Sequence, residues 1–93
     1  MENLEFEWDE EKAEKNLKKH RVSFEEAATI FNDPRIATIL DPDHSADEEC
    51  FVSLGRSFIQ RILSVVHTER NKRTRLISAR KATKTERKNY ENK

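Results

Sequence analysis

The chain has 93 residues and is expected to form one domain. Leu, Ile, Val and Phe make up just under a quarter of it, which allows only a small core, and the single cysteine, Cys50, excludes an intrachain disulfide and is expected to be buried as an apolar side chain. No apolar stretch approaches the ~20 residues of a membrane span, and the acidic N-terminus has no signal-peptide core, so we expect a cytoplasmic protein.

Opposite charges are concentrated in the two halves of the chain. Residues 1–50 contain 15 Asp and Glu against 6 Lys and Arg, a formal charge of −9. Residues 51–93 contain 12 Lys and Arg against 3 Asp and Glu, a formal charge of +9. The basic half is expected to bind an anionic partner, of which nucleic acid is the commonest.

The first predicted helix follows Asp9, which is a good N-cap, and ends at His20 after two lysines that suit the helix dipole. Phe6 and Trp8 are expected to staple its start.

A second helix is predicted to begin with a capping box formed by Ser23 and Glu26, and to stop at residues 32–34, Asn-Asp-Pro. Thr83 and Glu86 form another capping box, which starts a last helix without an apolar stripe.

Between these helices, β-branched and apolar runs separated by turn residues predict four strands, over residues 36–40, 50–54, 61–68 and 74–79. Because the connections are short, we expect an antiparallel sheet with the helices on one face. The predicted fold class is α+β: two N-terminal helices, a four-stranded antiparallel sheet and a C-terminal helix.

Asp41, Asp43 and His44 are dense enough to suggest a metal site, but Pro42 lies between them and the segment is more typical of a turn. We therefore expect no metal ligands. The sequence also contains no Walker loop, CxxC pair, zinc spacing or serine-nucleophile motif.

The period-two alternation of a strand places Arg75, Ile77 and Ala79 on one face and Leu76, Ser78 and Arg80 on the other. Both arginines lie near strand ends, where either can reach a shared groove. Further cations can join them there: Arg56, Arg61, Lys81, Lys84, Arg87 and Lys88. Each alone fits a solvated surface charge, but the set has few acidic partners nearby in the sequence and is interpreted as an anion-binding surface.

Two histidines are open to two interpretations each. His67, with Glu69 two residues on, is either a base with an orienting carboxylate or a histidine satisfied inside the sheet, which the spacing favours. His20, near Lys19, is either a general acid or a stabiliser of the helix end, and the latter is favoured.

An RNA ligand would make chemistry possible without a metal or cofactor, because RNA carries its own nucleophile, the 2′-hydroxyl. Alignment of that hydroxyl and neutralisation of the phosphate supply most of the acceleration, and arginine fits phosphate bidentately. Tyr90 is placed to stack on a base or to donate a proton.

Three parts of the chain resemble the BrnT toxins, and together they cover nearly its whole length. The matching segments are 6–13, 16–20 and 22–27 at the start, Arg56-Ser57 and 65–69 in the middle, and 75–83 with Glu86, Arg87 and Tyr90 at the end.

The resemblance implies a single RelE-like toxin domain over residues 1–93, a ribonuclease that blocks translation and growth. It also implies a type II toxin–antitoxin system: a BrnA-like antitoxin with a DNA-binding domain neutralises the toxin in a 2:2 heterotetramer, which binds operator DNA.

Candidate roles follow from the resemblance together with the strand argument. The candidate catalytic residues are Arg75, Arg80, His67, Glu69 and Tyr90; the candidate RNA-binding residues are Lys19, His20, Arg56, Lys81 and Arg87. Residues 58–60, Phe-Ile-Gln, depart from the expected loop and are a candidate antitoxin contact.

Two other functions compete with the ribonuclease. The chain could be a non-catalytic module whose basic half binds nucleic acid or an acidic partner. The two charged halves could instead pair between chains in a salt-sensitive dimer.

Overall fold

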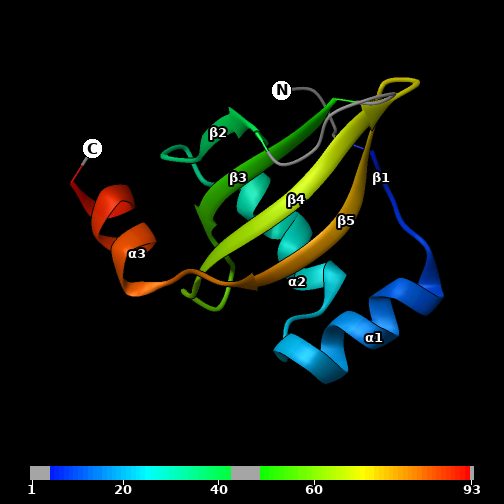
Figure 1. Cartoon of the computed structure of the whole chain (residues 1–93), viewed down its shortest axis with the longest axis horizontal. Coiled ribbons are helices and arrows are strands. Elements are labelled where there is room, and N and C mark those ends of the chain that lie inside the picture. The colour runs from blue at the N-terminus through cyan, green and yellow to red at the C-terminus, as the bar shows by residue number, and fades with distance from the viewer. Residues whose placement is uncertain (1–4, 43–48, 93) are drawn as a thin grey trace.

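The computed structural model describes residues 5–42 and 49–92 (Figure 1). Asp43 and His44, two residues of the predicted turn, lie outside them. In chain order, the elements are β1 (Phe6–Glu7), α1 (Glu10–His20), α2 (Phe24–Ala28), the 3₁₀ helix η1 (Thr29–Asn32), β2 (Ala37–Leu40), β3 (Cys50–Arg56), β4 (Ile62–Arg70), β5 (Arg73–Lys81) and α3 (Lys84–Glu91). Within the described residues, no helix has the length and apolar character needed to cross a membrane.

The sheet has five strands in the order β1-β5-β4-β3-β2. The four predicted strands are present and antiparallel, but β1 adds to β5 in parallel, with Phe6 beside Thr74 and Glu7 beside Arg75. The prediction of a purely antiparallel four-stranded sheet is therefore wrong in this detail. A two-residue strand is too short to show a period in the sequence.

Helix α2 and η1 cover one face of the sheet, and α1 lies along the outer edge of β5 (Figure 1). The core between them is formed by Val22, Phe24, Ala27, Ile30, Leu63, Val65, Leu76 and Ala79. Phe6 and Trp8, predicted to staple α1, pack against this core, on Phe31 (ring centroids 5.4 Å apart) and Phe24 (5.9 Å). Cys50 is buried, as predicted.

The side chain of Asn16 takes the place of a neighbouring strand at the edge of β5, where it bonds to the β5 backbone. Its side-chain amide accepts a hydrogen bond from the Ala79 N–H (3.1 Å) and donates to the Ala79 carbonyl (2.8 Å), beyond the point where β1 ends. It also donates to the Val22 carbonyl (2.9 Å), and the residue is buried. Backbone groups that a neighbouring strand would satisfy are thus satisfied by one helical side chain.

The predicted helix caps are present with one difference. Asp9 accepts from the N–H groups of the first turn of α1, and Thr83 and Glu86 form a complete capping box on α3. Ser23 accepts from the Glu26 N–H (3.0 Å), but the Glu26 carboxylate points to another part of the molecule, so α2 has half of its predicted box.

The β3–β4 hairpin turn holds residues 57–60, where the Gln60 N–H donates to the Ser57 carbonyl (2.8 Å) and Gln60 has φ of 70°. The turn exposes Phe58 and Ile59. Just before it, Gly55 lies so close to η1 that an added Cβ would meet the Ile30 Cβ at 2.9 Å, which only glycine avoids.

Candidate active site

A β-bulge decides which face of the sheet Arg75 occupies. Directly opposed residues of an antiparallel pair share a face, and Arg75 lies opposite Thr68 while Arg80 lies opposite Ser64. Strand β4 is regular between these two positions, whereas β5 holds one extra residue at Ile77.

Both arginines consequently lie on the face opposite α2 and η1, here called the far face. The alternation-based prediction that they lie on opposite faces is wrong. Burial agrees with the bulge, because Leu76 and Ala79 are three residues apart and both enter the core.

The far face contains a hollow of about 300 Å³, here called the far-face hollow. Its lining comes from four strands and the start of α3: Ile39, Asp41, Pro42, Val52, Ser64, Val66, Ser78, Arg80 and Glu86. The hollow thus combines an apolar floor with two hydroxyl groups and a charged rim.

Arg80 and Glu86 form a bidentate ion pair at the rim of this hollow. Arg80 Nη1 lies 2.8 Å from Glu86 Oε1, and Nη2 lies 3.0 Å from Oε2. The hydrogen bond from Arg80 lowers the pKa of the Glu86 carboxyl below its ordinary value, so Glu86 is ionised at neutral pH. The sequence identified Glu86 only as a capping residue, because nothing in the spacing of the two side chains shows that they meet.

Arg75 lies farther along the far face. Its Nη1 forms an ion pair with Glu7 Oε2 at 3.1 Å, which ties β1 to β5.

Lys19 and His20 line a different groove, along α1. This groove also contains Lys12, Lys15, Asn16, Ile77 and Ser78. Ser78 belongs to both the groove and the far-face hollow, so the two are adjacent.

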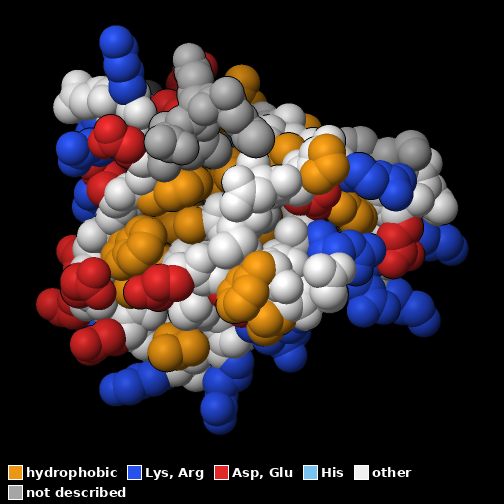
Figure 2. Space-filling model, turned by 180° about the vertical axis from the view of Figure 1, so that it is seen from behind, with side chains coloured by type: hydrophobic (Ala, Val, Ile, Leu, Met, Phe, Trp, Pro, Cys, Tyr) orange, Lys and Arg blue, Asp and Glu red, His pale blue; other side chains and the backbone are white. Residues whose placement is uncertain are grey.

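Three of the candidate RNA-binding residues meet at the end of the sheet, in a hollow of about 290 Å³ that we call the basic hollow. It is lined by Arg56, Gln60, Arg61, Ile62, Lys81, Ala82, Arg87 and Glu91. Figure 2 shows Lys and Arg side chains gathered over the end of the molecule that carries α3. Arg56, Lys81 and Arg87 thus meet one another, but neither Arg75 nor Arg80, with which the sequence analysis expected them to share a groove, lines this hollow.

Arg61 is fixed in the wall of the basic hollow by Glu26. Arg61 Nε donates to Glu26 Oε2 at 2.9 Å, Nη2 donates to Oε1, and the Ser57 hydroxyl donates to Oε2 at 2.7 Å. Burial alone would raise the pKa of the Glu26 carboxyl, but the hydrogen bonds from Arg61 and Ser57 outweigh it and leave the pKa below its ordinary value.

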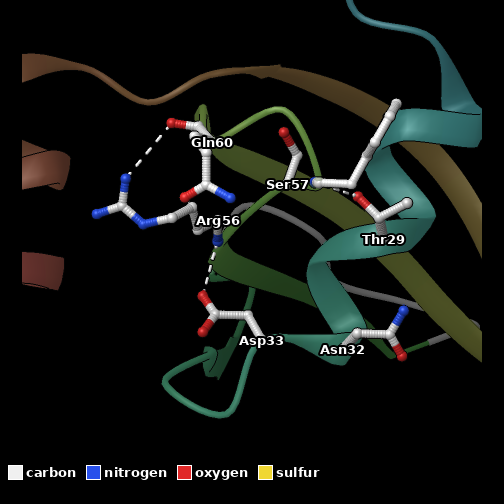
Figure 3. A pocket seen from close by; sticks show the side chains of 7 residues that line it. Thr29, Asn32, Asp33, Arg56, Ser57 and Gln60 are labelled. Atoms are coloured by element: carbon white, nitrogen blue, oxygen red, sulfur yellow. Dashed lines mark hydrogen bonds between the residues drawn. The ribbon is translucent and has the colours of Figure 1, made fainter.

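A neighbouring pocket lies between η1 and the β3–β4 turn (Figure 3). There the Arg56 N–H donates to Asp33 Oδ2 (2.7 Å), Arg56 Nη1 donates to the Gln60 carbonyl (3.4 Å), and the Phe58 N–H donates to Thr29 Oγ1 (3.0 Å). These contacts hold the turn against η1.

Tyr90 anchors α3 to the same region. The phenol is 3% exposed and donates a hydrogen bond to Asp33 Oδ2, while the guanidinium carbons of Arg56 and Arg35 lie 5.8 and 5.9 Å from the ring centroid. Burial and the bond to Asp33 raise the pKa of Tyr90. Tyr90 does not line the far-face hollow, so the structure does not bring it together with Arg80.

His67 and Glu69 are on the other side of the sheet from Arg80. His67 lies opposite Leu76 on the helix-covered face, edge-on to Phe31 and stacked on Phe51. Its Nε2 is 2.7 Å from Ser53 Oγ, and its Nδ1 is 3.6 Å from Glu69 Oε2.

The predicted His67–Glu69 pair therefore exists, but it cannot contact the same phosphate as Arg80, because the sheet separates them. The histidine lies inside the sheet, as the favoured interpretation expects, but it is only half satisfied: Nε2 contacts Ser53, whereas Nδ1 has no hydrogen-bond partner among the described residues. Burial lowers the pKa of His67, against the opposing effect of Glu69.

Within residues 5–42 and 49–92, no three His, Cys, Asp or Glu side chains gather closely enough to hold a metal ion. Of the acidic cluster considered in the sequence, Asp41 is buried at the far-face hollow.

Comparisons with known proteins identify the family. Residues 8–86 match the family model described as the ribonuclease toxin, BrnT, of type II toxin–antitoxin systems. The crystal structure of the Brucella abortus ribonuclease toxin BrnT superposes with a TM-score of 0.64 and 21% identity, covering 88% of this chain and all of that one. No curated protein matches the sequence. The family model covers most of the chain, and the chain therefore belongs to the BrnT family of ribonuclease toxins.

Proposed function

We propose that the far-face hollow cleaves RNA without a metal ion, by attack of a 2′-hydroxyl on the adjacent phosphorus. The observation that carries this proposal is the bidentate contact of Arg80 with a carboxylate at the rim of the hollow. A phosphodiester presents two anionic oxygens to a guanidinium in a similar way. Arg80 would neutralise the charge that develops on the phosphate in the transition state.

Glu86 is the proton acceptor in this scheme. When a phosphate takes the donors of Arg80, the ionised Glu86 carboxylate remains beside the hollow and accepts the proton of the attacking 2′-hydroxyl. The P–O5′ bond breaks, the departing 5′-oxygen takes a proton from solvent, and the products are a 2′,3′-cyclic phosphate and a 5′-hydroxyl.

The other candidate residues have supporting roles. Arg75, on the same face, would bind a phosphate farther along the strand. Lys19 and His20 would bind RNA in the adjoining α1 groove. Tyr90 is a positioning residue, because it holds α3 and hence Glu86 in place. His67 and Glu69 have no part in the proposed reaction.

The test is cleavage of RNA by purified protein in EDTA. Arg80→Ala should lower kcat by about 100-fold or more, as removal of a transition-state donor does elsewhere. Glu86→Gln keeps a hydrogen-bond acceptor for Arg80 but loses the proton acceptor, so kcat should fall while KM changes little.

Lys84→Ala is the matched control and should cleave like the unchanged protein, because this exposed cation in the first turn of α3 was expected in the anion-binding set but lines neither hollow. Full activity of Arg80→Ala, a requirement for added metal, or products with 3′-hydroxyl ends would each contradict the mechanism.

A type II toxin has an antitoxin partner, and we propose that it is a BrnA-like protein with a DNA-binding domain, which joins this RelE-like toxin in a 2:2 heterotetramer on operator DNA. Phe58 and Ile59 support this proposal, because their side chains are 68% and 50% exposed at the hairpin tip. The mass of the complex after co-expression measures the stoichiometry.

A further inference from the structure

The basic hollow is separate from the far-face hollow, and α3 contributes to both. Glu86 lines the far-face hollow, whereas Arg87 and Glu91 line the basic hollow. The basic hollow also takes Arg56 from the end of β3 and Lys81 from the end of β5. Four cations face one carboxylate in its lining.

The cations of this hollow are only partly neutralised by the protein. Arg61 is matched by the buried Glu26. Among the described residues, neither Lys81 nor Arg87 has an ion pair or a side-chain hydrogen bond, and Lys81 contributes only a longer-range attraction to Glu26.

The side chain of Arg56 is held in place by neutral groups, without an ion pair that would neutralise its charge. Its guanidinium donates to the Gln60 carbonyl (3.4 Å) and lies over the Tyr90 ring. No described carboxylate forms an ion pair with it, and Asp33 attracts it only at longer range. The left-handed conformation of Gln60 sets the position of that carbonyl. Arg56 and Arg61 therefore give the hollow a fixed wall, while Lys81 and Arg87 supply uncompensated charge.

We propose that the basic hollow binds a phosphate of single-stranded RNA that is not itself cleaved. The proposal rests on the proposed function. If RNA is cleaved in the far-face hollow, the same strand can continue past α3, which lines both hollows, into the basic hollow. Guanidinium groups with fixed geometry favour a tetrahedral anion with several acceptor oxygens, and contacts to phosphates position a strand without reading its sequence. The hollow would thus set where the strand lies relative to Arg80.

The experiment measures binding of a short, fully 2′-O-methylated RNA, which has no free 2′-hydroxyl and cannot be cleaved by this chemistry. Arg87→Gln and Lys81→Gln are each compared with Lys88→Gln. Lys88 was expected in the same anion-binding set, but it is an exposed neighbour on α3 that lines neither hollow, so its change removes the same charge from outside them. We expect the first two variants to weaken binding several-fold and to reduce the slope of log K against log salt by about 0.7 for each phosphate interaction removed. Lys88→Gln should change both much less.

Equal effects of all three variants would mean a diffuse charge effect and would overturn the proposal, as would unchanged affinity of Arg87→Gln. If Arg87→Gln instead weakened only the binding of an antitoxin, the hollow would be a protein-binding site and the phosphate assignment would be wrong. The failure of the proposed function is distinguishable: ordinary RNA would then remain uncut by the unchanged protein, whatever Arg87→Gln does to the methylated RNA.

Discussion

The surroundings of His67 make the stability of the fold depend on pH near neutrality. The imidazole is 4% exposed between two aromatic rings, and its pKa lies below the ordinary value of 6.5 because burial disfavours the cation. The unfolded chain, whose histidine titrates near that value, therefore binds a proton more readily than the native state. The contribution of His67 to stability is therefore fully present above pH 6.5 and is lost as the pH falls toward its native pKa.

We expect the free energy of unfolding to fall between pH 7.5 and pH 5.5, with most of the loss below pH 6.5 and a slope of at most about 1.4 kcal/mol per pH unit. Urea unfolding at several pH values measures this loss. In His67→Gln the loss over this range should largely disappear. The same pH dependence in both proteins would show that another group is responsible.

At the residue scale, the sequence predicts which residues can take part in a site better than it predicts what surrounds them. The pairing of His67 with Glu69 follows from strand spacing, but the face they occupy depends on which side the helices cover. Simple alternation puts Arg75 on the wrong face because a one-residue bulge at Ile77 inverts the pattern, and such a bulge is selected by packing of Leu76 and Ala79 rather than by a local signal.

At the scale of one element, α3 is held mainly by polar contacts. Among the described residues, its only buried side chain is Tyr90. Glu86 pairs with Arg80 and Tyr90 donates to Asp33, one turn apart on the helix. This explains why the sequence of the helix has no apolar stripe, and it means that each polar contact has a large share in docking.

Tyr90→Phe should therefore destabilise the protein by about 1–3 kcal/mol, the usual effect of losing a hydrogen bond to a charged group. Amide exchange should accelerate in α3 more than in β4, because the hydrogen bond from Tyr90 to Asp33 docks this helix and does not involve β4.

Asn89→Ala, an exposed change on the same helix, is the control and should leave exchange in the sheet and in α3 nearly unchanged. Slow exchange in α3 of Tyr90→Phe would mean that the Asp33 hydrogen bond does not hold the helix.

At the scale of the molecule, the oppositely charged halves of the chain contact each other within one copy. Glu26 pairs with Arg61, Glu7 with Arg75, and Glu5 Oε1 lies 3.2 Å from Arg73 Nε. Acidic residues of the first half and basic residues of the second half thus form ion pairs in the fold. The basic hollow keeps more cations than carboxylates.

The Glu26–Arg61 pair joins α2 to the start of β4 and is the most buried of these contacts. Glu26→Gln should lower the free energy of unfolding by about 3 kcal/mol, because Arg61 would lose its charged partner in a partly buried site. Thermal or urea unfolding measures the change.

Glu25→Gln, an exposed neighbour on the same helix, should cost much less. Comparable losses in the two variants would show that the buried pair is no more important than surface charge.

Much of the architecture is predictable, because it follows from local rules. Helix starts follow from the caps at Asp9 and Thr83, and the four long strands follow from runs of apolar and β-branched residues. Strand β1, the Asn16 contact with β5 and the Tyr90–Asp33 bond are not predictable, since each joins distant positions and depends on how finished elements meet. The candidate site is predictable as a set of cations, but not as two hollows separated by α3.

The close packing at Gly55, the chain's only glycine, affects which mutations can inactivate the protein. Every missense change of a glycine codon introduces a Cβ, and at this position the Cβ would lie too close to the Ile30 Cβ (2.9 Å) and tightly against its carbonyl oxygen (3.2 Å). A cell that carries a toxin of this family without its antitoxin is under selection to inactivate it. An amino-acid replacement at codon 55 would force η1 and β3 to shift relative to each other, so we expect inactivating missense changes selected in such a cell to include this codon.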